Sequence, residues 1–239
     1  MNIVDEKNFQ FLKYKEGNIN ILFSTGNNLI SYNRRTEDGI KNLENLKEIF
    51  PVKDVIYLSQ IHSDIVYEYN KESIKKLEGD GIITTNKNVA IGVFNADCVP
   101  VIIIDAKNQV ICAVHSGWKG TYKLIVSKAI EKMINIYNSN VEDIKVYIGP
   151  HNMKCCYEVS QELIEQFKLI PIYSYEIINN ERYLDLQRCI EIQLENLGVK
   201  KENINKTNTC TYCSKNIEFH SYRKDNTKNG RMFSFVYME

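Results

Sequence analysis

Residues 89–114 read VAIGVFNADCVPVIIIDAKNQVICAV and contain three short runs of apolar, largely β-branched residues. The runs are VAIGVF (89–94), VPVIIID (99–105) and QVICAV (109–114). Their length and composition predict buried strands, and AKN (106–108) between the last two predicts a hairpin turn. Two similar runs predict further strands outside this stretch, VIYLSQI (55–61) and IKVYIG (144–149).

Helices are predicted where apolar side chains recur at three- and four-residue spacing. The pattern covers residues 121–137, 160–167 and 186–197. Ser160 is a suitable N-cap for the second helix, and Gly198 is a suitable residue to end the third. In the first fifty residues, IKNLENLKEIF (40–50) predicts a short amphipathic helix, whereas FSTGNNLISYNRRTEDG (23–39) has the composition of loop and turn. Strands mixed with helices predict the α/β class with a mixed sheet.

Composition excludes several classes of protein. The 239 residues include 30 Lys+Arg and 30 Asp+Glu, and this zero net charge argues against nucleic-acid or membrane partners. The N-terminus lacks a signal-peptide core, and no apolar run reaches the roughly 20 residues of a membrane span, so we expect a cytoplasmic protein. The seven cysteines are odd in number and scattered, which does not favour a disulfide scaffold.

Three residues with metal-ligating side chains stand beside predicted strand ends. His62 follows the 55–61 run, Cys98 lies between two strands, and His115 follows the 109–114 run. A catalytic zinc uses three such ligands and keeps a fourth position open. Because the three residues are far apart in sequence, spacing alone favours three unrelated residues over a metal site.

The same residues also allow a thiol nucleophile. Cys98 beside a histidine has the chemistry of a Cys-His pair. Asp80 or Asp97 could orient that histidine or accept a proton. The alternative for Asp80, which precedes Gly81, is an ordinary turn residue.

The segment AVHSGWKG (113–120) places glycines where a strand passes into a helix. Gly117 and Gly120 allow a tight turn and a close approach to a ligand. The start of the following helix favours an anion, and Lys119 adds positive charge there. The loop is therefore a candidate phosphate site, although an exposed lysine in a simple turn is the alternative.

Near the C-terminus, Cys210 and Cys213 form a CxxC pair that has no second CxxC to complete a structural zinc site. We predict a turn with buried thiols. Arg223 and Arg231 follow, and each could bind a phosphate or carboxylate through two hydrogen bonds. Surface ion pairing is the alternative for both.

Seven segments of the chain occur in the order seen in one bacterial family. They are QIHSD (60–64), GDGIITT (79–85), NADCVPVIIID (95–105), AVHSGWKGT (113–121), YIGPHNMKCCYEV (147–159), LDLQ (184–187) and CTYCSKNIEFHSYRKDNTKNGRM (210–232). From about residue 55 to its end, the chain resembles the laccase-domain purine nucleoside phosphorylases, which were once assigned as multicopper polyphenol oxidases. The combination of ADC-x-P with H-[SA]-G-W-[KR]-G is highly specific.

This resemblance implies one domain over residues 1–239, with a mixed β-sheet core flanked by helical layers, similar to the deamidase domain of cytotoxic necrotizing factor. It implies a zinc site at His62, Cys98 and His115. The family's activities are phosphate-dependent cleavage of adenosine, inosine and methylthioadenosine to the free base and the pentose 1-phosphate, and hydrolytic deamination of adenosine. We expect small-molecule partners only, namely purine nucleosides and phosphate, and a monomer.

In phosphorolysis, phosphate attacks the ribose C1′ as the purine departs. Lys119, Arg223 and Asn95 are the candidates for binding phosphate or substrate, and Asp80 or Asp97 for moving a proton on the base. The chain departs from the family's pattern in FSTGNNLIS (23–31), which lacks an arginine, in Asn95, where the family has Thr, and in Lys224, where it has Arg.

Copper is the less favoured metal. Multicopper oxidase chemistry needs a blue-copper site and a separate trinuclear cluster, which four histidines cannot supply. Zinc suits mixed His/Cys ligation in a reducing cytosol. Two alternatives to a zinc enzyme are a metal-independent cysteine hydrolase that uses Cys98 and His115, and a nucleoside-binding module without turnover.

Overall fold

The computed structural model describes residues 1–70, 74–173, 177–179, 181–225 and 230–239, so residues 226–229 of the C-terminal motif lie outside the described residues. Within these ranges the strands form two six-stranded sheets and one two-stranded sheet. The first sheet has the order β1 (Asn2–Glu6), β2 (Phe9–Glu16), β3 (Ile19–Ser24), β14 (Met232–Met238), β7 (Val89–Asn95), β4 (Asp54–Ile56). The second has the order β13 (Ile204–Lys206), β10 (Ile144–Ile148), β8 (Val99–Asp105), β9 (Val110–Ser116), β6 (Gly81–Thr84), β5 (Val66–Glu68). The small sheet pairs β11 (Ile178–Asn179) with β12 (Tyr183–Leu184).

Both large sheets are mixed. Most neighbouring strands are antiparallel, whereas β4 and β7, β10 and β13, and β5 and β6 run parallel. The helices are α1 (Glu37–Ile49), α2 (Trp118–Tyr122), α3 (Ile125–Tyr137), α4 (Gln161–Lys168) and α5 (Leu186–Asn196), with short 3₁₀ turns at Asn27–Leu29 and Lys201–Asn203. None of the helices in the described ranges combines the length and hydropathy needed to cross a bilayer.

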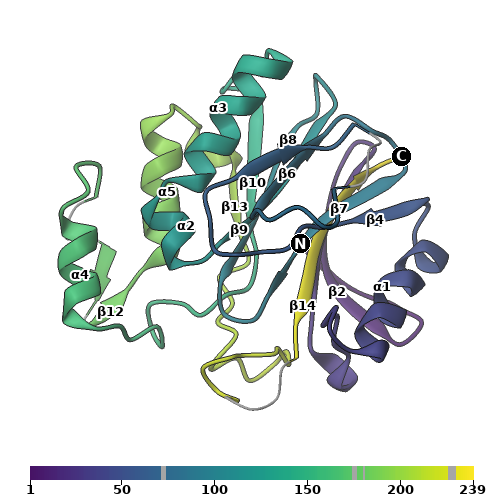
Figure 1. Ribbon diagram of the computed structural model, residues 1–239, viewed down its shortest axis with the longest axis horizontal. Coiled ribbons are helices and arrows are strands. Elements are labelled where there is room, and N and C mark those ends of the chain that lie inside the picture. Colours follow the sequence, from purple (N-terminus) through teal and green to yellow (C-terminus); the bar gives the residue numbers. More distant parts are fainter. Residues whose placement is uncertain (71–73, 174–176, 180, 226–229) are drawn as a thin grey trace.

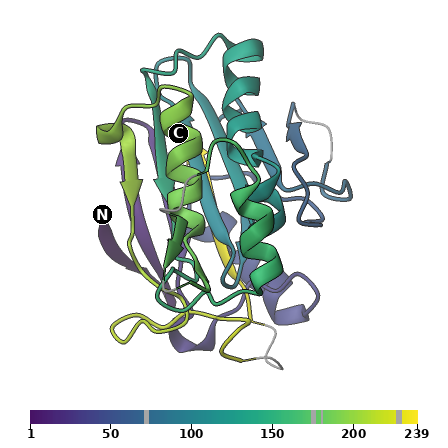
Figure 2. The same ribbon diagram turned by 90° about the vertical axis from the view of Figure 1, so that its left-hand side faces the viewer.

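The sheets pack face to face, with helices on both outer sides (Figures 1 and 2). Alternate residues of β8 divide between two cores, with Val101 and Ile103 facing α3 and α5, and Ile102 and Ile104 facing the first sheet. A third core, rich in aromatic rings, lies between the first sheet and α1. The prediction of a mixed α/β fold with flanking helices is therefore confirmed, and the structure adds that the β-core consists of two sheets.

The strands predicted from residues 89–114 are present as β7, β8 and β9. The run at 55–61 is strand only in its first two residues, in β4, after which the chain turns into the loop that carries His62. The helix predicted from residue 121 is divided, because Leu124 adopts a left-handed conformation with φ of 62° between α2 and α3. The carbonyl oxygen of Thr121 at this break accepts hydrogen bonds from Tyr173 and Gln193. Ser160 caps α4 as predicted, by accepting from the N–H of Leu163.

Candidate active site

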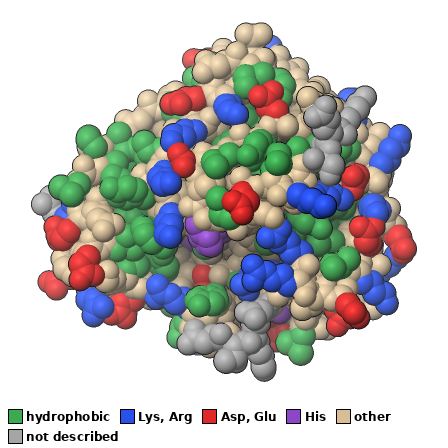
Figure 3. Space-filling model, viewed as in Figure 1, with side chains coloured by type: hydrophobic (Ala, Val, Ile, Leu, Met, Phe, Trp, Pro, Cys, Tyr) green, Lys and Arg blue, Asp and Glu red, His purple; other side chains and the backbone are tan. Residues whose placement is uncertain are grey.

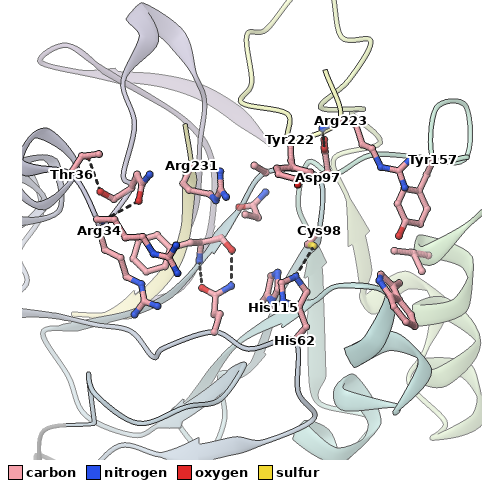
Figure 4. A pocket seen from close by; sticks show the side chains of 18 residues that line it. Arg34, Thr36, His62, Asp97, Cys98, His115, Tyr157, Tyr222, Arg223 and Arg231 are labelled. Carbon is pink, nitrogen blue, oxygen red and sulfur yellow. Dashed lines mark hydrogen bonds between the residues drawn. The ribbon is translucent and has the colours of Figure 1, made fainter. Parts of the chain in front are cut away.

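The β8–β9 hairpin brings two of the predicted metal ligands together. Its register pairs Pro100 with His115, so Cys98, just before β8, lies beside the end of β9. His62 reaches the same point from the loop after β4, with a left-handed φ of 59°. One ligand atom from each of His62, Cys98 and His115 lies within 4.8 Å of the others. Figure 4 shows the three side chains pointing toward one another, with 3.8 Å between Cys98 Sγ and His62 Nε2.

The buried carboxylate of Asp80 holds both histidines. Its Oδ1 lies 2.8 Å from His115 Nδ1 and accepts from the backbone N–H of His62 at 3.1 Å. Its Oδ2 accepts from the backbone N–H and the hydroxyl of Ser63 at 2.6 and 2.7 Å. Because Nδ1 of His115 faces Asp80, its Nε2 is left for the cluster. Asp80 therefore fixes the ring of one ligand and the loop of the other.

These contacts also set the charges of the site. Burial alone would raise the pKa of Asp80, but the hydrogen bonds and charge of His115 and the hydrogen bonds of Ser63 outweigh burial and lower it to about 2. Burial likewise opposes ionisation of Cys98, yet the charges and hydrogen bonds of His115 and His62 lower its pKa. The pKa of His115 is raised because Cys98 and Asp80 outweigh the opposing effect of burial. The thiolate, which is the form that ligates metals, is therefore favoured.

The three residues fit a metal ion by chemistry and by space. Two imidazole nitrogens and one thiolate sulfur are donors that zinc accepts, and the carboxylate behind His115 is the usual outer partner of a zinc-bound histidine. Gly117 makes room for the cluster, since a Cβ there would lie 2.9 Å from His62 Cδ2 and 3.0 Å from Cys98 Sγ. Glycine is thus required at position 117 because the side chains of His62 and Cys98 approach its backbone closely.

The cluster opens into a cavity of about 680 Å³, a size typical of small-molecule sites. Figure 3 shows a hollow on this face with a histidine at its edge and Lys and Arg side chains on both sides. The lining includes four arginines from distant parts of the chain, Arg34, Arg35, Arg223 and Arg231. Across the described ranges none of the four forms an ion pair with a carboxylate.

The arginines are oriented by neutral groups instead. Arg34 donates to Ser59 Oγ at 3.1 Å, and Arg231 donates to the carbonyl of Gly230 at 2.8 Å. Burial, and then the charge of Arg35, lower the pKa of Arg231 from its ordinary value. Since a guanidinium has five N–H donors, each of these side chains keeps donors for a bound anion. The lining therefore gathers four guanidinium groups that form no ion pair with a carboxylate in the described ranges, although Asp97 and Cys98 lie in the same lining.

Aromatic side chains also line the cavity. Phe94, Trp118, Tyr157 and Tyr222 all line it. The guanidinium carbon of Arg223 lies 5.2 Å from the centre of the Tyr157 ring, and Figure 4 shows this pair on the opposite side of the cavity from Arg34. Flat apolar surfaces beside polar groups suit a planar heterocycle joined to an anionic or hydroxylated part.

The other predicted residues have different surroundings. Both carboxylate oxygens of Asp97 accept hydrogen bonds from the protein, from Thr211 Oγ1 at 2.7 Å and from the N–H of Arg223 at 2.8 Å. The Asn95 amide donates to the Pro150 carbonyl and accepts from Ser234. Lys119 is exposed, lies over the Trp118 ring, and is not part of the cavity lining. The basic side chains that line the cavity are thus arginines, and Lys119 lies outside the lining.

Sequence reasoning missed Arg34 and Arg35 because the segment around them lacks the family's arginine at its usual place. The structure brings these two residues to the cavity from a loop just before α1. The only available signal was an adjacent pair of arginines in a loop next to an N-cap threonine. Sequence reasoning also missed Tyr157 and Tyr222, which carry no local pattern.

A second cluster forms at Cys155, Cys156, Cys210 and Cys213, whose sulfur atoms all lie within 4.8 Å of one another. The CxxC pair does lie in a turn, as predicted, and Cys210 is buried, but Cys213 is exposed. The sulfur neighbours of this pair are two adjacent cysteines earlier in the chain, Cys155 and Cys156, rather than a second CxxC.

Comparison with known proteins places these observations in a family. Residues 11–239 match the family model described as multi-copper polyphenol oxidoreductase laccase. A purine nucleoside phosphorylase of Clostridium acetobutylicum is 46% identical over 236 residues, which cover 99% of both chains. A purine nucleoside phosphorylase of Aquifex aeolicus is 37% identical over 78% of this chain and 85% of its own.

Solved structures share the fold. The hypothetical protein YfiH of Bacillus licheniformis superposes with a TM-score of 0.88 at 24% identity, covering 98% of both chains. YlmD of Geobacillus stearothermophilus has the same TM-score at 22% identity, covering 99% of this chain and 98% of its own.

Proposed function

Because the chain belongs to the multi-copper polyphenol oxidoreductase laccase family, whose relatives include proteins named purine nucleoside phosphorylase, we propose that it cleaves purine nucleosides with phosphate. The products are the free base and ribose 1-phosphate, or methylthioribose 1-phosphate when the substrate is methylthioadenosine. The proposal includes adenosine and inosine as substrates, and hydrolytic deamination of adenosine as a second activity at the same site. The resident metal in this proposal is zinc.

One observation carries the proposal. Four arginines, whose guanidinium groups form no ion pair with a carboxylate in the described ranges, converge on a cavity that also holds aromatic rings and the His/Cys/His cluster. Guanidinium groups bind phosphate through paired, charge-assisted hydrogen bonds. An anion and a planar base can therefore occupy the two sides of one cavity, as phosphorolysis requires.

Each part of the site has a task in this scheme. When bound at His62, Cys98 and His115, zinc supplies Lewis acidity. Arg34, Arg35 and Arg231 hold phosphate so that an oxygen faces C1′ of the ribose. Tyr157 and Trp118 provide apolar faces for the purine.

Asp80 keeps His62 and His115 in place through the contacts described above. Its pKa of about 2 leaves it ionised at neutral pH, which suits orientation better than proton donation. Asp97 connects Cys98 to the loops that carry Thr211 and Arg223, and we assign it a positioning role. The two histidines outside the cluster hold backbone carbonyls, since His151 pairs with Gly149 and His220 with Ile30. Neither of these histidines belongs to the cluster, and a single His/Cys/His set favours zinc over multicopper chemistry.

A second candidate function rests on the row formed by Asp80, His115 and Cys98. The Asp80 carboxylate lies 2.8 Å from Nδ1 of His115, and the pKa of the neighbouring Cys98 thiol is lowered. A cysteine hydrolase uses the same arrangement of carboxylate, histidine and thiol. Such an enzyme keeps its activity after exhaustive chelation. The zinc enzyme loses activity on chelation and regains it when zinc is added back.

The test is a chromatographic time course with the purified protein. Adenosine, inosine and methylthioadenosine are each incubated with and without phosphate, and bases and nucleosides are separated. We expect adenine or hypoxanthine to appear only with phosphate, and inosine to form slowly from adenosine in either condition. Absence of every product would overturn the enzyme proposal, and binding without turnover would then favour a nucleoside-binding module.

A further inference from the structure

The cluster of four cysteines lies outside the cavity and is formed by two loops. Cys155 and Cys156 belong to the turn after β10, and Cys210 and Cys213 to the turn after β13. The two turns are joined by backbone pairing, since the N–H of Thr211 donates to the carbonyl of His151 at 2.9 Å. A further hydrogen bond closes the second turn, from the N–H of Ser214 to the carbonyl of Cys210 at 3.1 Å. The sulfurs are thus brought together by ordered backbone.

The distances match a tetrahedral metal site better than a disulfide. With zinc–sulfur bonds of about 2.3 Å, the edge of a sulfur tetrahedron is about 3.8 Å. Cys155 Sγ and Cys213 Sγ are 3.7 Å apart, and all four sulfurs lie within 4.8 Å of one another. A disulfide needs about 2.05 Å between its sulfurs. The cysteines therefore form a cage of the right size for a cation.

Burial separates these four cysteines from the remaining cysteines of the core. Cys112 and Cys189 are buried in the apolar core that contains α3 and α5, and they belong to neither metal-ligand cluster. In the four-cysteine cluster Cys210 is buried, whereas Cys155 and Cys213 are exposed.

We propose that Cys155, Cys156, Cys210 and Cys213 bind one structural zinc ion, separate from the site at His62, Cys98 and His115. All four ligands come from protein, so no coordination position is left for a substrate. Each thiol that binds releases its proton to solvent, and no electron is transferred. The proposal does not depend on the function of the cavity.

The zinc joins two segments that continue into the cavity wall. Tyr157 directly follows Cys156, and Arg223 is ten residues beyond Cys213 and donates to the carbonyl of Glu158 at 2.8 Å. Thr211, between the two CxxC cysteines, donates to the Asp97 carboxylate next to Cys98. A metal at the four cysteines thus fixes the loops on which Tyr157, Arg223 and Asp97 depend.

Metal counting on protein purified under reducing conditions tests the proposal without any turnover. The intact chain should contain two zinc ions, and the double variant Cys155→Ser/Cys213→Ser should contain one. These two side chains are exposed, so their replacement leaves the hydrophobic cores unchanged. Cys189→Ala, which removes a cysteine outside both clusters, should keep two. His115→Ala should also lose one zinc, from the other site.

Zinc X-ray absorption identifies which site remains. In His115→Ala the average environment should become four sulfurs at about 2.3 Å, whereas in the double variant it should be dominated by nitrogen. Equal zinc content in the double variant and the intact chain would overturn the proposal. So would a Cys155–Cys213 disulfide, detected as two thiols that resist alkylation until a reductant is added.

Discussion

Within the described ranges, two clusters of side chains could each hold a metal ion, and they differ in their surroundings. His62, Cys98 and His115 mix nitrogen with sulfur and face a cavity lined by arginines. The four cysteines offer only sulfur, lie on joined loops, and none of them lines that cavity. A catalytic metal keeps an open position whereas a structural metal is closed by protein ligands. The neighbours of a cluster, rather than its ligands alone, therefore indicate its role.

The largest effect is expected from removing a ligand of the cavity cluster. Cys98→Ala should reduce phosphorolysis below detection, because two imidazoles alone would hold the proposed zinc poorly. The measurement is base release at saturating substrate, with Cys189→Ala as the matched control. Activity retained in Cys98→Ala would assign catalysis to another part of the molecule and remove the contrast between the two clusters.

A smaller loss is expected when the support behind the histidines is weakened. Asp80→Asn keeps the shape of the side chain but removes its charge, and replacing such an outer partner typically costs about 10- to 100-fold in metal affinity or activity. Zinc titration and kcat/KM measure the two effects. Asp54→Asn, at a partly exposed ion pair with Lys75 outside both clusters, is the control and should bind zinc and turn over as the intact chain does. A loss of less than twofold in Asp80→Asn would contradict the positioning role.

The arginines of the cavity should affect phosphate binding in particular. A charge-assisted hydrogen bond contributes roughly 1.5–3 kcal/mol, so Arg231→Ala should raise the KM for phosphate about tenfold or more. Lys119→Ala removes a nearby exposed charge that does not line the cavity, and should change this KM less than twofold. A larger increase of this KM in Lys119→Ala than in Arg231→Ala would indicate that phosphate binds at the loop of residues 113–120.

An intermediate effect is expected from the four-cysteine cluster. Cys155→Ser/Cys213→Ser should raise the KM for nucleoside several-fold and lower the melting temperature, because the loops before Tyr157 and Arg223 lose their common anchor. The turnover number should change less, since the cavity cluster is intact. Loss of turnover as complete as that of Cys98→Ala would show that the two clusters do not have separate roles.

The smallest effect concerns a position remote from both clusters. Glu16 accepts from Lys145 at 2.7 Å and from the Tyr147 hydroxyl at 2.9 Å, which links the two sheets. Burial opposes ionisation of Glu16, but these partners outweigh burial and lower its pKa below the ordinary value of 4.5. Because the folded-state pKa is lowered, this stabilisation is complete above pH 4.5 and is lost as the pH falls through the folded-state pKa.

Glu16→Gln should therefore lower the free energy of unfolding by less than about 1 kcal/mol at neutral pH, since solvent screens this partly exposed pair. The difference from the intact chain should disappear in acid. Urea unfolding at two pH values measures it. Any change in zinc content would contradict the separation of this position from both clusters.

The fold was predictable where apolar runs are continuous, as in β7, β8 and β9. The strands β2 and β3 were missed because FQFLKYKE mixes lysines with apolar residues and because their burial depends on distant partners. The break between α2 and α3 at Leu124 could not be predicted, because the apolar residues keep their helical spacing across it. A backbone conformation fixed by Tyr173 and Gln193 leaves no local signal.

The cavity cluster could be predicted only through resemblance to a family, since His62 and Cys98 are 36 residues apart. The hairpin register explains in retrospect why Cys98 meets His115. The sequence did not indicate that the four cysteines lie together. The partners of the CxxC pair are the adjacent Cys155 and Cys156, and Cys155 is 58 positions before Cys213. The sequence also did not indicate that Arg34 and Arg35 line the cavity, because tertiary packing alone brings their loop to the other cavity residues.

Phosphorus-31 NMR of the protein with adenosine and inorganic phosphate tests the proposed phosphorolysis directly. We predict that phosphate is converted to ribose 1-phosphate in an amount equal to the adenine released. We also predict that this conversion disappears in Cys98→Ala but continues in Cys155→Ser/Cys213→Ser. Adenine released without consumption of phosphate, or equal conversion in Cys98→Ala and the intact chain, would contradict the account.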